Sequence, residues 1–203
     1  MIKALDSCYK NAIEGIPGFE TVEELGDSYL LKDGTLEDKI DSFISYQKYK
    51  CATSGFLTGL GGIITLPIAV PANVTSVLYI QLRMIAVIAY MSGFNVKDDR
   101  VQTLVYVALC GNAGAELLKN SGIKISERLS IELIKKIPAE VIKAINKAVG
   151  FRLVTKFGQK GLINLSKMAP LVGGLIGGAF DWTTTNTVGN RAKKMFFEKN
   201  LRE

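Results

Sequence analysis

Three charged side chains in this 203-residue sequence stand among apolar residues, and they are the ones best placed to bind a ligand or move a proton. They are Arg83, Glu116 and Asp181. Because a buried charge is costly unless it is paired, we expect Arg83 to meet Glu116 or Asp181 inside the fold. The cluster would be either an internal salt bridge that sets helix register or a ligand-binding or catalytic site. Polar residues that could complete it are Gln81, Asn112, Asn186, Asn190 and Arg191.

The sequence has no histidine, which excludes every site that needs an imidazole as base or ligand. The excluded classes are Ser-His-Asp and Cys-His hydrolases and the usual zinc enzymes. Cys8, Cys51 and Cys110 are far apart and lack CxxC spacing, so we expect buried structural thiols in a reducing compartment. No catalytic residue, metal ligand or cofactor is predicted.

Charge is distributed unevenly along the chain. Residues 1–50 carry 6 basic and 10 acidic side chains, whereas residues 119–167 carry 11 basic and 3 acidic ones. The second stretch predicts a cationic surface that could face anionic lipid, nucleic acid or the acidic first fifty residues, or form a solvated helix face. Nucleic acid is the least favoured partner, because aromatic stacking residues and nucleic-acid-binding motifs are lacking. The candidate basic residues are Lys135, Lys136, Lys143, Lys147, Arg152, Lys156 and Lys160.

A run of 32 residues without charge extends from Cys51 to Leu82, which is long enough to span a membrane. Its glycines, together with Pro67 and Pro71, interrupt a straight helix. We therefore predict a helical hairpin over 55–92 whose second arm, 74–92, is apolar on most sides.

Glycines four residues apart favour close packing of helices. A phosphate-binding loop at Gly55 to Gly62 is disfavoured, because no lysine follows Gly62 and no strand is predicted before Gly55. The predicted packing glycines are Gly55, Gly59, Gly173, Gly174, Gly177 and Gly178.

The remaining pattern is helical, and no stretch shows the alternation of a β-sheet. The spacing of Thr21 and Glu24 predicts a capping box, and Thr35 and Pro138 mark the starts of two further helices. The first 18 residues lack an apolar stretch of signal-peptide length, so we expect the protein to stay inside the cell. Helices are expected at 1–14, 21–26, 35–47, 98–118, 126–137, 138–157 and 171–200.

Several short motifs follow one another between residues 50 and 197. They are a Leu-Pro in a glycine-rich segment, the tripeptide QLR, a small-residue helix that ends at Glu116, PLVGG from Pro170, and Asp181 ahead of a Val-Gly. In this order they resemble the EcsC family of bacterial proteins, whose name comes from an operon that includes an ABC transporter. The resemblance implies a helical protein acting at or near the cytoplasmic face of the membrane, without implying a particular activity.

The sequence thus predicts one all-α domain over 1–203, a helical bundle with the glycine- and proline-rich hairpin at its centre. Segments 98–119 and 169–197 should pack around the hairpin, with the basic helices 126–157 outside. Residues 1–40 lie outside the resemblance and would be a variable acidic extension or a partner-binding arm.

The preferred function is non-enzymatic. The protein would associate with the inner face of the cell membrane, bind anionic lipid or a membrane protein through its basic face, and bury or insert the apolar hairpin. One alternative is a soluble helical bundle that binds a protein partner or an apolar ligand and keeps the hairpin internal. Another is an enzyme that uses Arg83, Glu116 and Asp181 without histidine.

Overall fold

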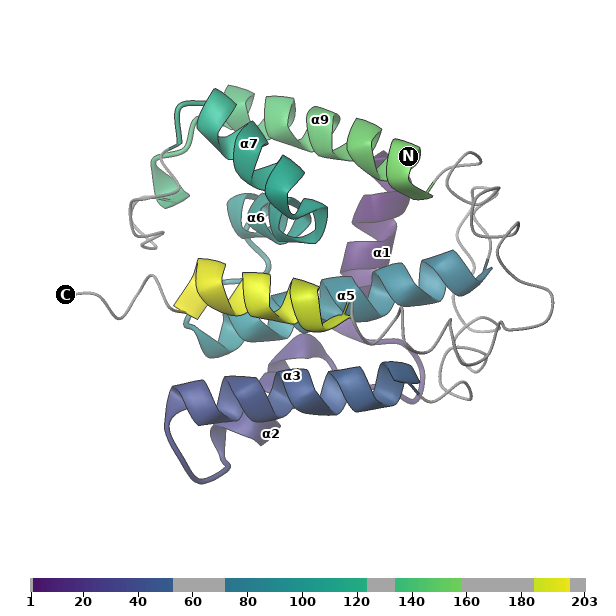
Figure 1. Cartoon of the computed structure of the whole chain (residues 1–203), viewed down its shortest axis with the longest axis vertical. Coiled ribbons are helices and arrows are strands. Elements are labelled where there is room, and N and C mark those ends of the chain that lie inside the picture. The colour runs from purple at the N-terminus through teal and green to yellow at the C-terminus, as the bar shows by residue number, and fades with distance from the viewer. Residues whose placement is uncertain (1, 53–71, 124–133, 158–184, 198–203) are drawn as a thin grey trace.

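The computed structural model of the chain describes residues 2–52, 72–123, 134–157 and 185–197 (Figure 1). These residues form helices joined by turns, and no strand occurs among them, which confirms the all-α prediction. Residues 185–192 are helical and lead directly into the last element. In chain order the elements are α1 (Ile2–Glu14), α2 (Val22–Leu30), α3 (Leu36–Ala52), α5 (Ala72–Met91), α6 (Asp99–Cys110), α7 (Asn112–Asn120), α9 (Ala139–Phe157) and the π-helix η1 (Lys193–Phe197).

Helix α5 lies at the centre of the bundle, where it contacts α1, α2, α3, α6 and η1. Figure 1 shows it between α2 and α3 on one side and α6, α7 and α9 on the other. Every side chain from Tyr79 to Ala89 is buried, as expected for this part of the arm predicted at 74–92. Full burial of a single Ile or Leu side chain contributes about 1.5–3 kcal/mol. The other arm of the predicted hairpin lies outside the described residues.

Helix α1 belongs to the core. Its buried face consists of residues three or four apart, namely Leu5, Cys8, Tyr9 and Ala12. The hydroxyl of Tyr9 donates a 2.8 Å hydrogen bond to the backbone carbonyl of Val96, and α1 packs along α5. The acidic segment 1–40 is therefore not a separate arm, because its first helix supplies part of the packed interior.

Helices α2 and α3 begin with the same kind of side-chain cap. In the box predicted before α2, the backbone N–H of Glu24 donates to Thr21 Oγ1 at 3.1 Å, and the N–H of Thr21 donates to Glu24 Oε2 at 2.8 Å. Thr35 and Asp38 repeat the arrangement before α3, at 3.2 and 3.0 Å. Hydrogen bonds from Thr21 lower the pKa of Glu24, and those from Thr35 lower the pKa of Asp38. Each cap satisfies backbone donors that the first helical turn leaves unpaired.

Helix α2 continues to Leu30, beyond the predicted end at residue 26. Gly26 is a buried helical residue, and a Cβ at this position would collide with the ring of Tyr90 on α5. The glycine thus allows α2 to approach α5 closely. Tertiary packing outweighs the low helix propensity of glycine here.

A break at Gly111 divides the single helix predicted over 98–118 into α6 and α7, so that prediction is wrong. Gly111 has φ 67° and ψ −135°, a conformation that other residues rarely adopt. A Cβ on Gly111 would also collide with the guanidinium of Arg191. The break therefore lies at a glycine where both the backbone geometry and the close approach of a residue 80 positions later exclude a side chain.

Helix α9 follows Pro138, whose backbone carbonyl accepts hydrogen bonds from the N–H groups of Val141 and Ile142, both at 3.1 Å. Its start agrees with the prediction to within one residue. The helix packs on α6, α1 and α7, and in Figure 1 it lies at the edge of the bundle. Its described buried side chains are Ile142, Ile145 and Val149.

Candidate functional site

Arg83 is a charged residue enclosed by the bundle, with 8% of its surface exposed. One terminal nitrogen, Nη1, donates to the hydroxyl of Tyr79 at 3.4 Å, and the other, Nη2, donates to the backbone carbonyl of Glu20. The guanidinium carbon lies 5.9 Å from the centre of the Phe19 ring. These contacts position the side chain between α5 and the segment that leads into α2.

Among the described residues, the structure does not bring Glu116 and Arg83 together. Glu116 lies exposed on α7, so the expectation of a buried Arg83–Glu116 pair is wrong. Asp181 lies outside the described residues. Gln81 is buried on α5 with 4% exposed, while Arg191 is half-buried and donates from Nη2 to Oδ1 of Asn112 at 3.4 Å. The described partners of Arg83 are thus Tyr79 and the backbone of Glu20 rather than Glu116, and the expected pair with Asp181 stays a prediction.

The sequence contains a signal for one of the two hydrogen bonds of Arg83 but not for the other. Tyr79 lies four positions before Arg83, a spacing that places both side chains on one helix face. Glu20 accepts through its backbone carbonyl, which every residue carries, so the sequence pattern contains no signal for that contact.

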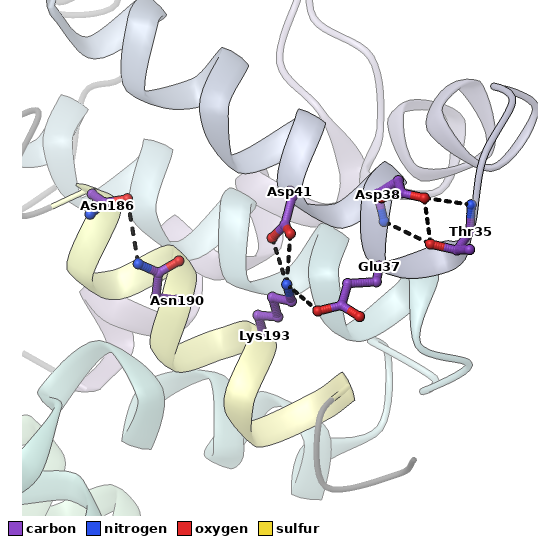
Figure 2. Close-up of polar contacts among 7 residues, drawn as sticks. All are labelled: Thr35, Glu37, Asp38, Asp41, Asn186, Asn190 and Lys193. Carbon is purple, nitrogen blue, oxygen red and sulfur yellow. Dashed lines mark hydrogen bonds and ion pairs between the residues drawn. The ribbon is translucent and has the colours of Figure 1, made fainter.

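A second polar cluster joins α3 to η1 and was not predicted (Figure 2). Lys193 Nζ lies 2.7 and 2.8 Å from the two carboxylate oxygens of Asp41 and 2.9 Å from Oε1 of Glu37. Lys193 has 7% of its surface exposed. Burial alone would lower its pKa, but the hydrogen bonds and charges of Asp41 and Glu37 outweigh burial and raise it. A basic residue near the C-terminal end thereby pairs with the acidic first fifty residues.

The basic residues around α9 form the third candidate site. Lys135, Lys136, Lys143 and Lys147 are all exposed, and we call them the α9 basic face. Glu140 is the acidic residue within the same described stretch, 134–150. Arg152 and Lys156 lie on α9, where the structure describes the backbone but not their side chains, and Lys160 lies outside the described residues.

Cys8 is fully buried in α1, and burial raises the pKa of its thiol to about 12, which keeps it neutral and unreactive. Cys110 is half-buried, and the structure does not describe the side chain of Cys51. The six glycines predicted to pack helices also lie outside the described residues, so their role stays a prediction.

None of the helices described here has both the length and the apolar character that a membrane crossing requires. The EcsC protein family matches residues 10–199. No curated protein and no solved structure shows a significant match to the chain. The family match begins within α1 and covers most of the acidic segment that we expected to lie outside it. With nearly its whole length matched, this chain belongs to the EcsC protein family.

Proposed function

We propose that this EcsC-family protein is a non-enzymatic helical protein that binds the anionic inner surface of the cell membrane through the α9 basic face. The observation that carries the proposal is the exposure of four lysines within residues 135–147, namely Lys135, Lys136, Lys143 and Lys147. Basic residues held near an anionic bilayer each contribute about 1 kcal/mol to binding at moderate salt.

The two sides of α9 have different roles. Ile142, Ile145 and Val149 pack into the bundle, so the fold uses the apolar side of the helix. Lys143 and Lys147 are four residues apart and therefore project from the same side of the helix. Since both are exposed, they are available to contact lipid phosphates.

The proposal does not require insertion of α5 into the bilayer. The side chains from Tyr79 to Ala89 are buried by the surrounding helices, and their exposure would disrupt the core. Binding would then be electrostatic and sensitive to salt, because exposed charges are screened beyond about 8 Å at physiological ionic strength.

A second candidate function follows from the same burial of α5. In this reading the protein is a soluble bundle that binds a protein partner, including a membrane protein, or an apolar ligand. It predicts a monodisperse protein purified without detergent that does not bind protein-free vesicles. The third reading, an enzyme built on Arg83, Glu116 and Asp181, lacks support because Glu116 lies at the surface.

Co-sedimentation with liposomes tests the proposal. The wild-type protein should pellet with vesicles that contain phosphatidylserine at low salt, should be released by high salt, and should not pellet with pure phosphatidylcholine. The variant Lys143→Gln/Lys147→Gln should bind about thirtyfold more weakly, since it removes two basic contacts of about 1 kcal/mol each.

A matched control removes the same charge elsewhere. Lys32 and Lys194 are both exposed and lie outside α9, so Lys32→Gln/Lys194→Gln should bind vesicles nearly as well as the wild-type protein. Equal losses in the two double variants would indicate a general charge effect, and no binding of the wild-type protein at low salt would overturn the membrane role.

A further inference from the structure

A cavity of about 170 Å³ lies against Arg83, between the turn that precedes α2 and helices α2, α3 and α5. Exposed Gly18 and Glu20 lie at its rim, so it is reached from the surface. A cavity of about 150 Å³ in another protein admits benzene, so this space is sufficient for a group of several heavy atoms. The lining residues are Gly18, Phe19, Glu20, Leu25, Gln47, Lys50, Tyr79, Ile80 and Arg83.

The guanidinium of Arg83, a residue that lines this cavity, is incompletely paired. Its Nε N–H is buried and has no hydrogen-bond partner. The bonds to Tyr79 and the Glu20 carbonyl use the two terminal nitrogens and involve neutral acceptors. No carboxylate of the described residues forms a salt bridge with Arg83. Glu24 interacts with Arg83 through its charge without forming a salt bridge, so the Nε N–H stays an unpaired buried donor, a costly arrangement that an oxyanion would relieve.

The other polar residues of the cavity favour an anion as well. Lys50, half-buried at the end of α3, supplies a second cation, and the buried Gln47 one turn earlier adds an amide. Glu20 is the acidic residue of the lining, but it is exposed, and its contact with Arg83 is through its backbone. Arginine forks and lysine point charges together are typical of phosphate recognition.

We infer that this cavity is a phosphate-binding site, in which the Nε N–H of Arg83 and the ammonium of Lys50 hold a phosphate group. The apolar residues Leu25 and Ile80 lie beside the anion position and would contact the carbon atoms of a phosphate ester. The group could come from a lipid headgroup or from a soluble phosphate ester, since both present the same oxygens.

The site is separate from the surface of the proposed function. The cavity involves α2, α3 and α5, and none of its lining residues lies on α9. Phosphate binding and vesicle binding can therefore fail independently, and variants of each site serve as controls for the other.

Isothermal titration calorimetry and thermal unfolding of the full chain test the site with inorganic phosphate, against chloride at equal ionic strength. Phosphate should raise the melting temperature and give a saturable binding heat. Arg83→Gln should weaken binding about tenfold or more, because a charge-assisted hydrogen bond is lost. Lys50→Gln should weaken it by a smaller factor, and Lys143→Gln/Lys147→Gln should leave it unchanged.

Lys50→Gln keeps the test decisive if the buried Arg83→Gln variant does not fold. Unchanged phosphate affinity in Lys50→Gln would overturn the proposal, as would a wild-type response to phosphate no larger than that to chloride. Loss of phosphate binding in the α9 variant would assign the anion to the basic face instead and would also overturn it.

Two further titrations distinguish the sources of the phosphate. Glycerol 3-phosphate represents a soluble ester, and short-chain phosphatidic acid below its micelle concentration represents a headgroup. Tighter binding of the lipid would identify a headgroup site, and equal binding would identify a soluble-ester site. Either assignment requires that Arg83→Gln also weakens binding of the ligand in question.

Discussion

Lys193 of η1 donates to both carboxylate oxygens of Asp41 on α3, at 2.7 and 2.8 Å, although 152 positions separate the two residues (Figure 2). The ammonium is buried, while the carboxylates of Asp41 and Glu37 are half exposed. This pairing attaches η1 to the acidic first fifty residues of the chain. It also accounts for a buried lysine, which would be costly without a partner.

We expect Asp41→Asn to lower the free energy of unfolding by about 1–3 kcal/mol, because a hydrogen bond to a buried charge is weakened while Glu37 still pairs with Lys193. Urea unfolding at neutral pH measures the change. The control is Asp33→Asn, an exposed residue in the turn before α3, for which a change within about 0.5 kcal/mol is expected. Equal effects of the two substitutions would show that the pairing contributes no net stability.

The pairing also has a pH dependence. The folded pKa of Lys193 is raised above its ordinary 10.5, so its contribution is complete below that value and is lost as the pH rises through the folded pKa. The stability that this pair contributes is therefore lost only under strongly alkaline conditions, and the pair stays intact at neutral pH.

Burial of the Cys8 thiol predicts that the free energy of unfolding begins to decline at mildly alkaline pH. In the unfolded chain this thiol releases its proton near pH 9, whereas in the folded chain burial raises its pKa to about 12. Between these values the unfolded state binds fewer protons, so stability falls as pH rises, by at most about 1.4 kcal/mol per pH unit for this group. Urea unfolding from neutral pH to about pH 10 measures the slope.

Cys8→Ala should reduce that slope, although it also costs packing energy. The difference between the variant and the wild-type protein at neutral pH measures packing, and its change toward pH 10 measures ionisation. A constant difference across this range would mean that the thiol does not contribute. Tyr9 also has a raised pKa because of burial, so a decline that begins near pH 10 should persist in the variant.

Gly111 should tolerate no side chain. Gly111→Ala is expected to lower the free energy of unfolding by about 2–4 kcal/mol, because the backbone has a positive φ and the methyl group would strike Arg191. Thermal or urea unfolding measures the loss. Gly122 is the matched control, since it has φ 78° but nothing within 4 Å of the position that a methyl group would take, so Gly122→Ala should cost only about 1 kcal/mol. Similar losses at both glycines would exclude the collision.

Features that depend on residues within a few positions were predictable. The Thr21–Glu24 cap and the start of α9 after Pro138 arise from contacts three or four residues apart, which the sequence displays directly. The burial of α5 was predictable for a related reason, since its apolar residues leave no polar face to meet water. The all-α class follows from the same helical periodicity.

Features that depend on distant segments needed the folded structure. Arg83 is held by the backbone carbonyl of Glu20, 63 positions away, and no side-chain pattern reports where a carbonyl will point. The contact of Gly111 with Arg191 and the pairing of the buried Lys193 with Asp41 and Glu37 each join segments far apart in the chain. Local spacing dictates which helices form and which faces are apolar, whereas the choice of partner for each charge is made only when helices far apart in the chain pack together.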